Sequence, residues 1–338
     1  MLFTIVLAIV TFVSIYLILP IFSRKRNTNT LNIKDKHVLI TGCDSGFGRE
    51  IALQLDKMGA YVLATCLTKE GAQNLRSVAS EKLKTFQMDV TDSQQIKQVF
   101  CKVNQLLEGS SGLWGLVNNA GILTVGPVEW IPLDAYKKVA DVNLWGLIDV
   151  TKTFLPLVKK AKGRIVIVSS IAGVVSPQAF SPYCISKYGV EAFADALRRE
   201  MSPFDVQVSV IEPGATRTPI VNDELLSARL KQFWDNLTEE KQREYGKQYL
   251  ENVTNGFRDW CKSASEQVSH VIDGIVSPLT SQSPKKRYVI GQDAWKLKFL
   301  SYLPESLQDF VLREFPFKAV VPSDRNMFEN SYMNGSAH

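Results

Sequence analysis

The stretch HVLITGCDSGFG, residues 37–48, decides the fold of this 338-residue chain. It begins as a short apolar strand, and the helix after it places Ile51, Leu55 and Met58 on one face before a second strand at 61–64. Strand, glycine turn, helix and strand form a βαβ unit. A glycine turn alone can be only a tight loop, but this placement favours binding of a pyrophosphate at the helix N-terminus by Gly42, Gly46 and Gly48.

Downstream of this unit, apolar strands and helical stretches keep alternating, six times in all. The pattern predicts a parallel, doubly wound α/β sheet of the Rossmann type in a single domain at residues 37–300, after a polar linker at 23–36. A strand at 287–290 adds a last member. Polar turns that follow strands should meet at one edge of the sheet, where ligands bind. They hold Asp89, Val90, Asn118, Asn119, Ala120, Gly121, Pro213, Gly214 and Thr218.

Tyr183 and Lys187 lie four residues apart at the start of a predicted helix, 183–201. They therefore share one helix face. A phenol has a pKa of roughly 10, and a neighbouring ammonium lowers that pKa toward the range of a useful base. Ser170, just after an apolar strand at 164–169, would place its hydroxyl opposite Tyr183. The spacing alone is a weak signal, and its position in the α/β pattern makes it a candidate catalytic set.

Asn143 falls inside a predicted helix over residues 135–160. Because asparagine is a poor residue for a helix interior, it is either a tolerated surface residue or a polar group placed for a purpose.

The choice between NAD and NADP depends on the end of the second strand. An acidic residue there would bind the adenosine ribose of NAD, but Thr65 and Cys66 occupy the position. The glycine turn carries Asp44 and Ser45 and has no Lys or Arg to meet a 2′-phosphate, and Lys69 is the nearest base after the strand. We therefore expect NAD rather than NADP.

Composition excludes several other classes of protein. The net charge of +5 is mild and the basic residues are dispersed, so we expect no nucleic-acid partner. Five cysteines and three histidines show no metal-ligand spacing, so we expect no metal site and reduced thiols.

The N-terminus predicts a membrane anchor. Residues 1–22 are uncharged and 2–19 almost wholly apolar, which is the length of a membrane-spanning helix. A cleaved signal peptide would show a basic start and a small-x-small site, and a buried core helix would show a polar face; neither is present. The basic flank Arg24, Lys25 and Arg26 places the following domain on the cytosolic side.

Two later segments depart from the α/β pattern. Residues 220–262 are charged, helical and rich in aromatics, and we interpret them as a substrate lid, with a solvated helical pair as the alternative. A C-terminal segment, 301–338, continues an apolar and aromatic stretch at 295–317 that is too charged to span a bilayer. That stretch either lies on a membrane or closes the substrate pocket.

Taken together, these motifs resemble the classical short-chain dehydrogenase/reductase superfamily over about residues 34–300. The segments TGCDSGFG, ATCLTKEGA, GLWGLVNNAG and SYLP are similar to those of one branch of this superfamily. That branch holds the membrane-anchored retinol dehydrogenases, the 3α/17β-hydroxysteroid dehydrogenases and 11β-hydroxysteroid dehydrogenase type 2.

The resemblance implies a role for each motif residue. Tyr183 is the general acid/base, Lys187 lowers its pKa and holds the nicotinamide ribose, Ser170 orients the substrate oxygen, and Asn143 supports a water-linked proton relay. The implied cofactor contacts are Gly42, Asp44, Ser45, Gly46, Phe47 and Gly48 in the pyrophosphate turn, Asp89 and Val90 at the adenine, Asn118 to Gly121 along the cofactor, and Pro213, Gly214 and Thr218 at the nicotinamide.

It also implies an NAD-dependent dehydrogenase of a lipophilic alcohol, a retinol or a hydroxysteroid, anchored in the endoplasmic reticulum membrane and paired as a homodimer through the helices of Asn143 and Tyr183. Two alternatives remain open. One is an NADP-linked carbonyl reductase of lipids, and the other is a non-catalytic, cofactor-binding membrane scaffold. The intact set of Ser170, Tyr183 and Lys187 argues against the scaffold.

Overall fold

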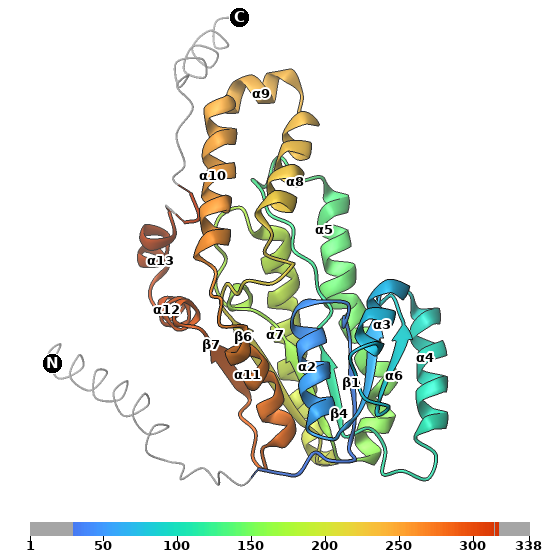
Figure 1. The fold of residues 1–338 in the computed structure, drawn as a ribbon. Coiled ribbons are helices and arrows are strands. Elements are labelled where there is room, and N and C mark those ends of the chain that lie inside the picture. Colours follow the sequence, from blue (N-terminus) through green and yellow to red (C-terminus); the bar gives the residue numbers. More distant parts are fainter. Residues whose placement is uncertain (1–29, 314, 318–338) are drawn as a thin grey trace, which may run out of the picture.

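The computed structural model describes residues 30–313 and 315–317. A seven-stranded parallel sheet with strand order β3-β2-β1-β4-β5-β6-β7 forms its centre (Figure 1). The predicted doubly wound sheet is therefore confirmed, including the last strand. The strands are β1 (His37–Ile40), β2 (Tyr61–Cys66), β3 (Leu83–Gln87), β4 (Gly115–Asn118), β5 (Arg164–Val168), β6 (Gln207–Pro213) and β7 (Arg287–Ile290).

The strand order places the functional turns side by side. The chain starts at β1, moves outward to β3, then crosses back to β4 on the other side of β1 and moves outward to β7. Val38 of β1 pairs with Val62 of β2 on one side and with Gly115 of β4 on the other. In such sheets the ligand crevice lies at this switch point, outside the carboxyl ends of the strands. The turns after β1 and β4 both open there.

Helices cover both faces of the sheet and bury a core against each. On one face, Ile51, Leu75 and Ile275 belong to one buried cluster; on the other, Phe154 and Val190 belong to a second. The first layer consists of α2 (Gly46–Lys57), α3 (Lys69–Arg76) and α11 (Val268–Thr280), and the second of α4 (Ser93–Leu106), α6 (Leu147–Lys160) and α7 (Ser181–Met201).

The helix predicted at 135–160 is confirmed, but it is not α-helical throughout. The chain forms α5 (Leu133–Ala140), then a π-helical turn at Asp141–Gly146, then α6. π-Helical turns are rare and often occur at functional sites. Here the wider turn contains Asn143, whose side chain is fully buried and bonded to the neighbouring chain. The alternative of a surface asparagine is therefore wrong.

Three helices rise from the carboxyl-end side of the sheet and form the upper part of Figure 1. They are α8 (Asp223–Asp235), α9 (Glu239–Tyr245) and α10 (Lys247–Ser263). A third buried cluster, which we call the lid core, fills the space beneath them. Its aromatic members are Trp130, Phe180, Phe233, Trp234, Phe257 and Phe317, and Tyr183 packs against it. The helices of residues 220–262 are therefore not a merely solvated pair, because they bury an aromatic interior.

Two short helices follow β7, namely α12 (Gln292–Leu300) and α13 (Glu305–Leu312). Beyond them, Phe317 returns into the lid core. Among the described residues, no helix is long and apolar enough to cross a bilayer. The anchor predicted at 1–22 lies outside the described residues, as do most of the linker and the tail after 317.

Candidate active site

Ser170, Tyr183 and Lys187 come together at the carboxyl end of β5. Ser170 follows this strand directly, and its Oγ accepts a hydrogen bond from the Ala172 amide at 3.1 Å. Tyr183 lies in the first turn of α7, and its hydroxyl is hydrogen-bonded to Ser170. Lys187 follows one turn later, where its Nζ donates to the Val168 carbonyl at 2.9 Å and lies 5.6 Å from the centre of the Tyr183 ring.

Burial sets the protonation of both groups. It raises the pKa of Tyr183 to about 12, although the hydrogen bond from Ser170 opposes the shift. It lowers the pKa of Lys187 to about 8, with the carboxylate of Glu191 acting the other way. The expected lowering of the Tyr183 pKa is therefore not what this structure shows. The physical reason is that desolvation dominates, while the Lys187 ammonium is turned toward a main-chain carbonyl.

The Asn143 side chain joins the chain after β4 to helix α7. Its Oδ1 accepts from the Ile122 amide at 2.8 Å, and its Nδ2 donates to the Ile122 carbonyl at 2.9 Å and to Ser186 Oγ at 3.0 Å. Ser186 Oγ in turn donates to the Tyr183 carbonyl at 2.7 Å. This arrangement fixes the backbone around Tyr183 against the turn at the end of β4.

The glycine turn packs backbone to backbone against the turn after β4. Gly42 has φ +70°, and a Cβ there would lie 2.8 Å from the Ala120 Cα. A Cβ on Gly48 would lie 2.2 Å from the Gly42 carbonyl oxygen. Asn119 Nδ2 donates to the carbonyls of Thr41 and Gly42 at 2.9 and 3.1 Å. Only glycine fits at Gly42 and Gly48. Because neither residue carries a side chain, the start of α2 stays accessible to a ligand.

The N-terminus of α2 suits a diphosphate. Ser45 precedes the helix without a side-chain capping bond within the described chain, and the first turn, which includes Phe47, holds no acidic residue. The first amides of a helix lack partners within it and favour negative charge. Gly46 has φ +59°, and a Cβ there would lie 3.7 Å from Pro219 Cδ and 3.8 Å from Thr218 Cβ. The residues present therefore fit a nicotinamide dinucleotide.

Asp44 lies at the end of the second strand in space, although it belongs to the glycine turn in sequence. Its Oδ2 accepts from the Leu67 amide at 2.8 Å, and its Oδ1 accepts from the amide and hydroxyl of Thr68 at 2.9 and 2.8 Å. Thr68 Oγ1 also caps α3 by accepting from the Gly71 amide at 2.9 Å. A carboxylate therefore occupies the region where the sequence had no acidic residue.

The other expected cofactor contacts lie along the same edge. Asp89 and Val90 follow β3, and Asp89 Oδ1 accepts from the Thr91 amide at 2.9 Å. Asn118 donates to Thr151 Oγ1 at 2.9 Å, and its Oδ1 is buried without a hydrogen-bond partner among the described residues. The set is completed by Gly121 beside Asn143, by Pro213 at the end of β6, by Gly214, whose amide donates to the Ile290 carbonyl at 2.9 Å, and by Thr218.

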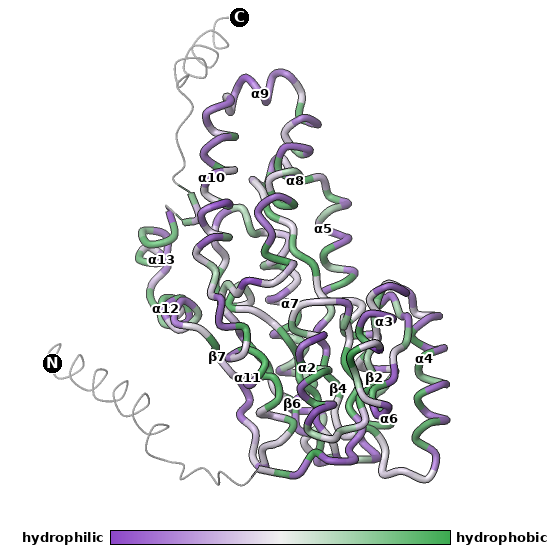
Figure 2. Tube along the Cα trace, in the orientation of Figure 1, coloured by the Kyte–Doolittle hydropathy of each residue, from purple (hydrophilic) through white to green (hydrophobic). Residues whose placement is uncertain are grey.

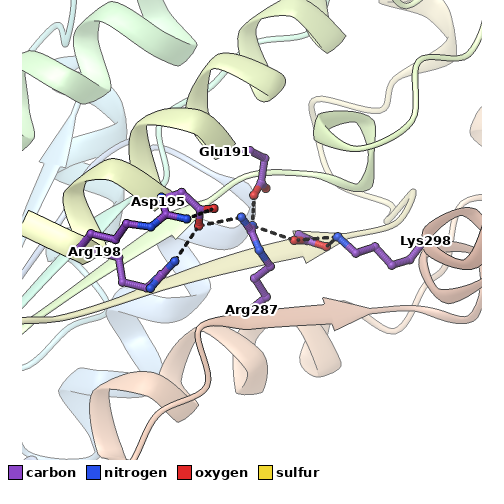
Figure 3. A network of polar contacts seen from close by, with 7 residues as sticks. Glu191, Asp195, Arg198, Arg287 and Lys298 are labelled. Carbon is purple, nitrogen blue, oxygen red and sulfur yellow. Dashed lines mark hydrogen bonds and ion pairs between the residues drawn. The ribbon is translucent and has the colours of Figure 1, made fainter. Parts of the chain in front are cut away.

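A partly buried ion network behind the site was missed from the sequence. Glu191, one turn beyond Lys187, pairs with Arg287 of β7, which also contacts Asp195 at 2.9 Å and Glu212 at 3.2 Å (Figure 3). Glu212 is fully buried and pairs with Lys298 of α12 at 3.1 Å. These residues are far apart in the chain and carry no motif, so only the fold brings them together.

Comparison with known proteins agrees with this geometry. Residues 36–227 match the family model described as short chain dehydrogenase. The chain belongs to this family. It is 43% identical over 311 residues to "Retinol dehydrogenase 7" of Rattus norvegicus, covering 90% of this chain and 96% of the relative.

Other relatives lie at similar distances. "Short-chain dehydrogenase/reductase family 9C member 7" of Mus musculus is 44% identical, covering 86% of this chain and 93% of that protein. "D-beta-hydroxybutyrate dehydrogenase, mitochondrial" of Rattus norvegicus is 42% identical, covering 81% and 82%. The chain thus falls in the branch that contains retinol dehydrogenases. It is an oxidoreductase that interconverts an alcohol and its carbonyl compound with NAD or NADP.

Solved structures share the fold. A short chain dehydrogenase from Burkholderia cenocepacia in complex with NADP superimposes with a TM-score of 0.63 at 18% identity, covering 83% of this chain and 99% of that chain. One from Burkholderia phymatum in complex with NAD gives 0.64 at 20% identity, covering 86% and 99%. Because the two neighbours hold different cofactors, the fold does not select between NAD and NADP.

Proposed function

We propose that this protein is an NAD-dependent dehydrogenase of a lipophilic alcohol, either a retinoid or a hydroxysteroid. The observation that carries the proposal is the meeting of Ser170, Tyr183 and Lys187 at the carboxyl end of β5, beside a glycine turn that fits a dinucleotide. These three side chains are the catalytic residues, and Asn143 positions the backbone that carries Tyr183.

In the oxidation, Tyr183 first loses its own phenol proton to solvent, and the resulting phenolate accepts the proton of the alcohol hydroxyl while Ser170 orients the same hydroxyl. When bound, the oxidised nicotinamide supplies the acceptor for the hydride that leaves the carbinol carbon. Loss of that proton and hydride leaves the carbonyl product. The Lys187 ammonium, 5.6 Å from the centre of the Tyr183 ring, supplies positive charge that favours the phenolate during this transfer. The backbone at Gly46 and Gly48 would hold the pyrophosphate.

Asp44 supports NAD over NADP. Its carboxylate lies at the end of β2 and already accepts three hydrogen bonds from residues 67 and 68. A 2′-phosphate brought to that region would meet a fixed negative charge, whereas a ribose hydroxyl would meet an acceptor.

The lid core supports an apolar substrate. Tyr183 lies at its border, between the glycine edge and a cluster of aromatic side chains. The names of the relatives point both to retinol and to the small, polar D-beta-hydroxybutyrate. The amount of apolar surface close to Tyr183 favours the former.

We place the protein in the endoplasmic reticulum membrane, with residues 1–22 as the anchor and the catalytic domain on the cytosolic side, because of the basic flank at 24–26. Exposed Trp145, Ile185 and Tyr188 on the π-helical turn and α7 support a homodimer formed by these helices.

The proposal is tested by measuring cofactor reduction with the full chain in microsomes. All-trans-retinol and 3α-androstanediol are each offered with NAD and with NADP. Turnover with NAD and one of these alcohols supports the proposal. The corresponding carbonyl compounds are offered with NADH and with NADPH, and faster turnover of these with NADPH would favour the reductase alternative. NADH binding without turnover of either alcohol would overturn the substrate class and favour the scaffold.

A further inference from the structure

Helices α12 and α13 expose an unusual concentration of large apolar side chains, which we call the aromatic face. Its members are between 49% and 72% exposed: Trp295, Phe299, Tyr302, Leu307, Phe310 and Val311. Trp295 and Phe299 lie four residues apart on one side of α12, and Tyr302 lies in the turn just after this helix. Leu307, Phe310 and Val311 follow the spacing i, i+3, i+4 along one side of α13. Single exposed apolar residues are normal on a protein surface, whereas a group of this size marks an interaction site.

The side chains of the aromatic face do not belong to the protein core. On α12 the inward side is occupied separately, because Ala294 and Leu300 are buried and Lys298 pairs with Glu212. α13 buries none of its own residues. Leu307, Phe310 and Val311 are therefore not accounted for by packing in the protein interior. Figure 2 shows this helix standing at the flank of the molecule, outside the sheet and the lid.

The composition of the aromatic face fits a bilayer surface. Tryptophan and tyrosine carry an apolar ring with a polar tip, and they concentrate at the boundary between headgroups and acyl chains. Lys296 lies exposed among these rings, and the Arg313 guanidinium lies 5.6 Å from the Phe310 ring centre. Long basic side chains can reach headgroups while their stems stay on apolar surface.

The position of the aromatic face agrees with the same occupant. Thr30 bridges Ser281, and the Leu31 amide donates to the Thr280 carbonyl at 2.6 Å. The described chain therefore begins beside the segment that leads into β7, the edge strand, and α12 follows β7 directly (Figure 1). Residues 20–29 separate this point from the apolar stretch 2–19 and can span at most about 35 Å. The start of the described chain and the aromatic face thus both lie along the β7 edge of the sheet.

We propose that the aromatic face of α12 and α13 docks on the phospholipid bilayer that holds the N-terminal anchor, as a second, interfacial contact. This inference rests on the anchor in the proposed function. The docked helices would also border the lid core, because Gln178 Nε2 donates to the carbonyls of Arg313 and Phe317 at 3.2 and 2.7 Å, and Phe317 packs inside that core. A lipophilic alcohol dissolved in the membrane would then reach the lid without crossing water.

The test is tryptophan fluorescence of the full chain in phosphatidylcholine vesicles whose acyl chains carry bromine near the headgroup. Bromine quenches only indole rings close to it. The intact chain and Trp295→Phe are compared. Trp145→Phe is the matched control because Trp145 is similarly exposed in one copy of the chain, at 58% against 62%, but lies on the surface proposed above for the homodimer and not on the aromatic face. We expect Trp295→Phe to lose most of the quenching and Trp145→Phe to retain it.

A second variant keeps Trp295 as the reporter. Phe299→Gln combined with Phe310→Gln removes two members of the aromatic face, both outside the catalytic and cofactor residues, and should weaken the quenching of Trp295. Equal quenching of the intact chain and Trp295→Phe would overturn the proposal. So would a Trp295 emission that brominated lipid leaves unchanged, since the face would then meet solvent, a second copy or another protein. The measurement needs no turnover, so its failure is separate from failure of the proposed chemistry.

Discussion

The cofactor edge and the lid of this protein are built in different ways. At the cofactor edge, the turns after β1 and β4 touch through backbone atoms, with Gly42 and Gly48 at distances that no side chain would allow. In the lid, Trp130 meets Trp234, Tyr245 and Tyr249 with ring centres 5.2–5.6 Å apart. Backbone contacts tolerate almost no change, whereas a cluster of rings can be repacked. One scaffold can therefore keep its chemistry and alter its substrate.

The largest expected effect concerns the ion network around Arg287, which belongs to neither region. Arg287→Met would leave Glu191 without its cation and the buried Glu212 with only Lys298. Removing one partner of a buried network costs about 3 kcal/mol of stability. Thermal unfolding of the detergent-solubilised full chain measures it. Lys162→Met, which breaks the exposed pair with Asp205, is the control and should change stability by less than about 1 kcal/mol. Equal shifts for both variants would refute the distinction.

The next effect tests the rigidity of the cofactor edge. In Gly48→Ala the new Cβ would meet the Gly42 carbonyl at 2.2 Å, so the turn must move. We expect NADH affinity to fall about 100-fold, which corresponds to about 2.7 kcal/mol. NADH fluorescence titration gives the affinity. Gly109→Ala serves as the control, because Gly109 also has a positive φ, +76°, but no atom within 4 Å of its Cβ position. It should leave NADH affinity unchanged.

A smaller effect, confined to the substrate, is expected from Trp130→Ala. This change removes the ring on which three lid aromatics pack. The KM for the lipophilic alcohol should rise about 10-fold, equivalent to about 1.4 kcal/mol, while NADH affinity stays the same. Phe204→Ala is a suitable control, since Phe204 is half-exposed after α7 and away from the lid core. A parallel loss of NADH affinity would show that the two regions are not separable.

The smallest effect is a pH dependence of stability from Lys187. Its pKa is about 8 in the folded protein and near 10.5 when unfolded, so at pH 8 to 10.5 the unfolded chain binds more protons. The contribution of Lys187 to stability should therefore rise with pH in this window, by about 1 kcal/mol from pH 8 to 9. Above pH 10, Tyr183 acts in reverse because its pKa is raised to about 12. Unfolding of the cofactor-free chain at each pH measures the gain, and Lys187→Met should lack it.

The same division explains what could be predicted from the sequence. Short motifs revealed the cofactor edge, because turns after parallel strands must meet at one edge, and Ser170, Tyr183 and Lys187 were found in this way. Asp44 was expected in the cofactor turn, but its position at the end of β2 required the fold. The π-helical turn around Asn143 was missed because the apolar period of a helix hardly changes when one residue is inserted. The Arg287 network carries no motif, since its members come from α7, β6, β7 and α12.

The measurement that tests the central claim most directly is alcohol oxidation by Tyr183→Phe in the same membranes as the intact chain, with NADH affinity determined in both. This variant keeps the ring that packs against the lid core and removes only the hydroxyl bonded to Ser170. We predict that kcat falls by at least about 100-fold, the usual contribution of general acid–base catalysis, at unchanged NADH affinity. A kcat within a few-fold of the intact chain would contradict the account, because the proton would then leave by another group.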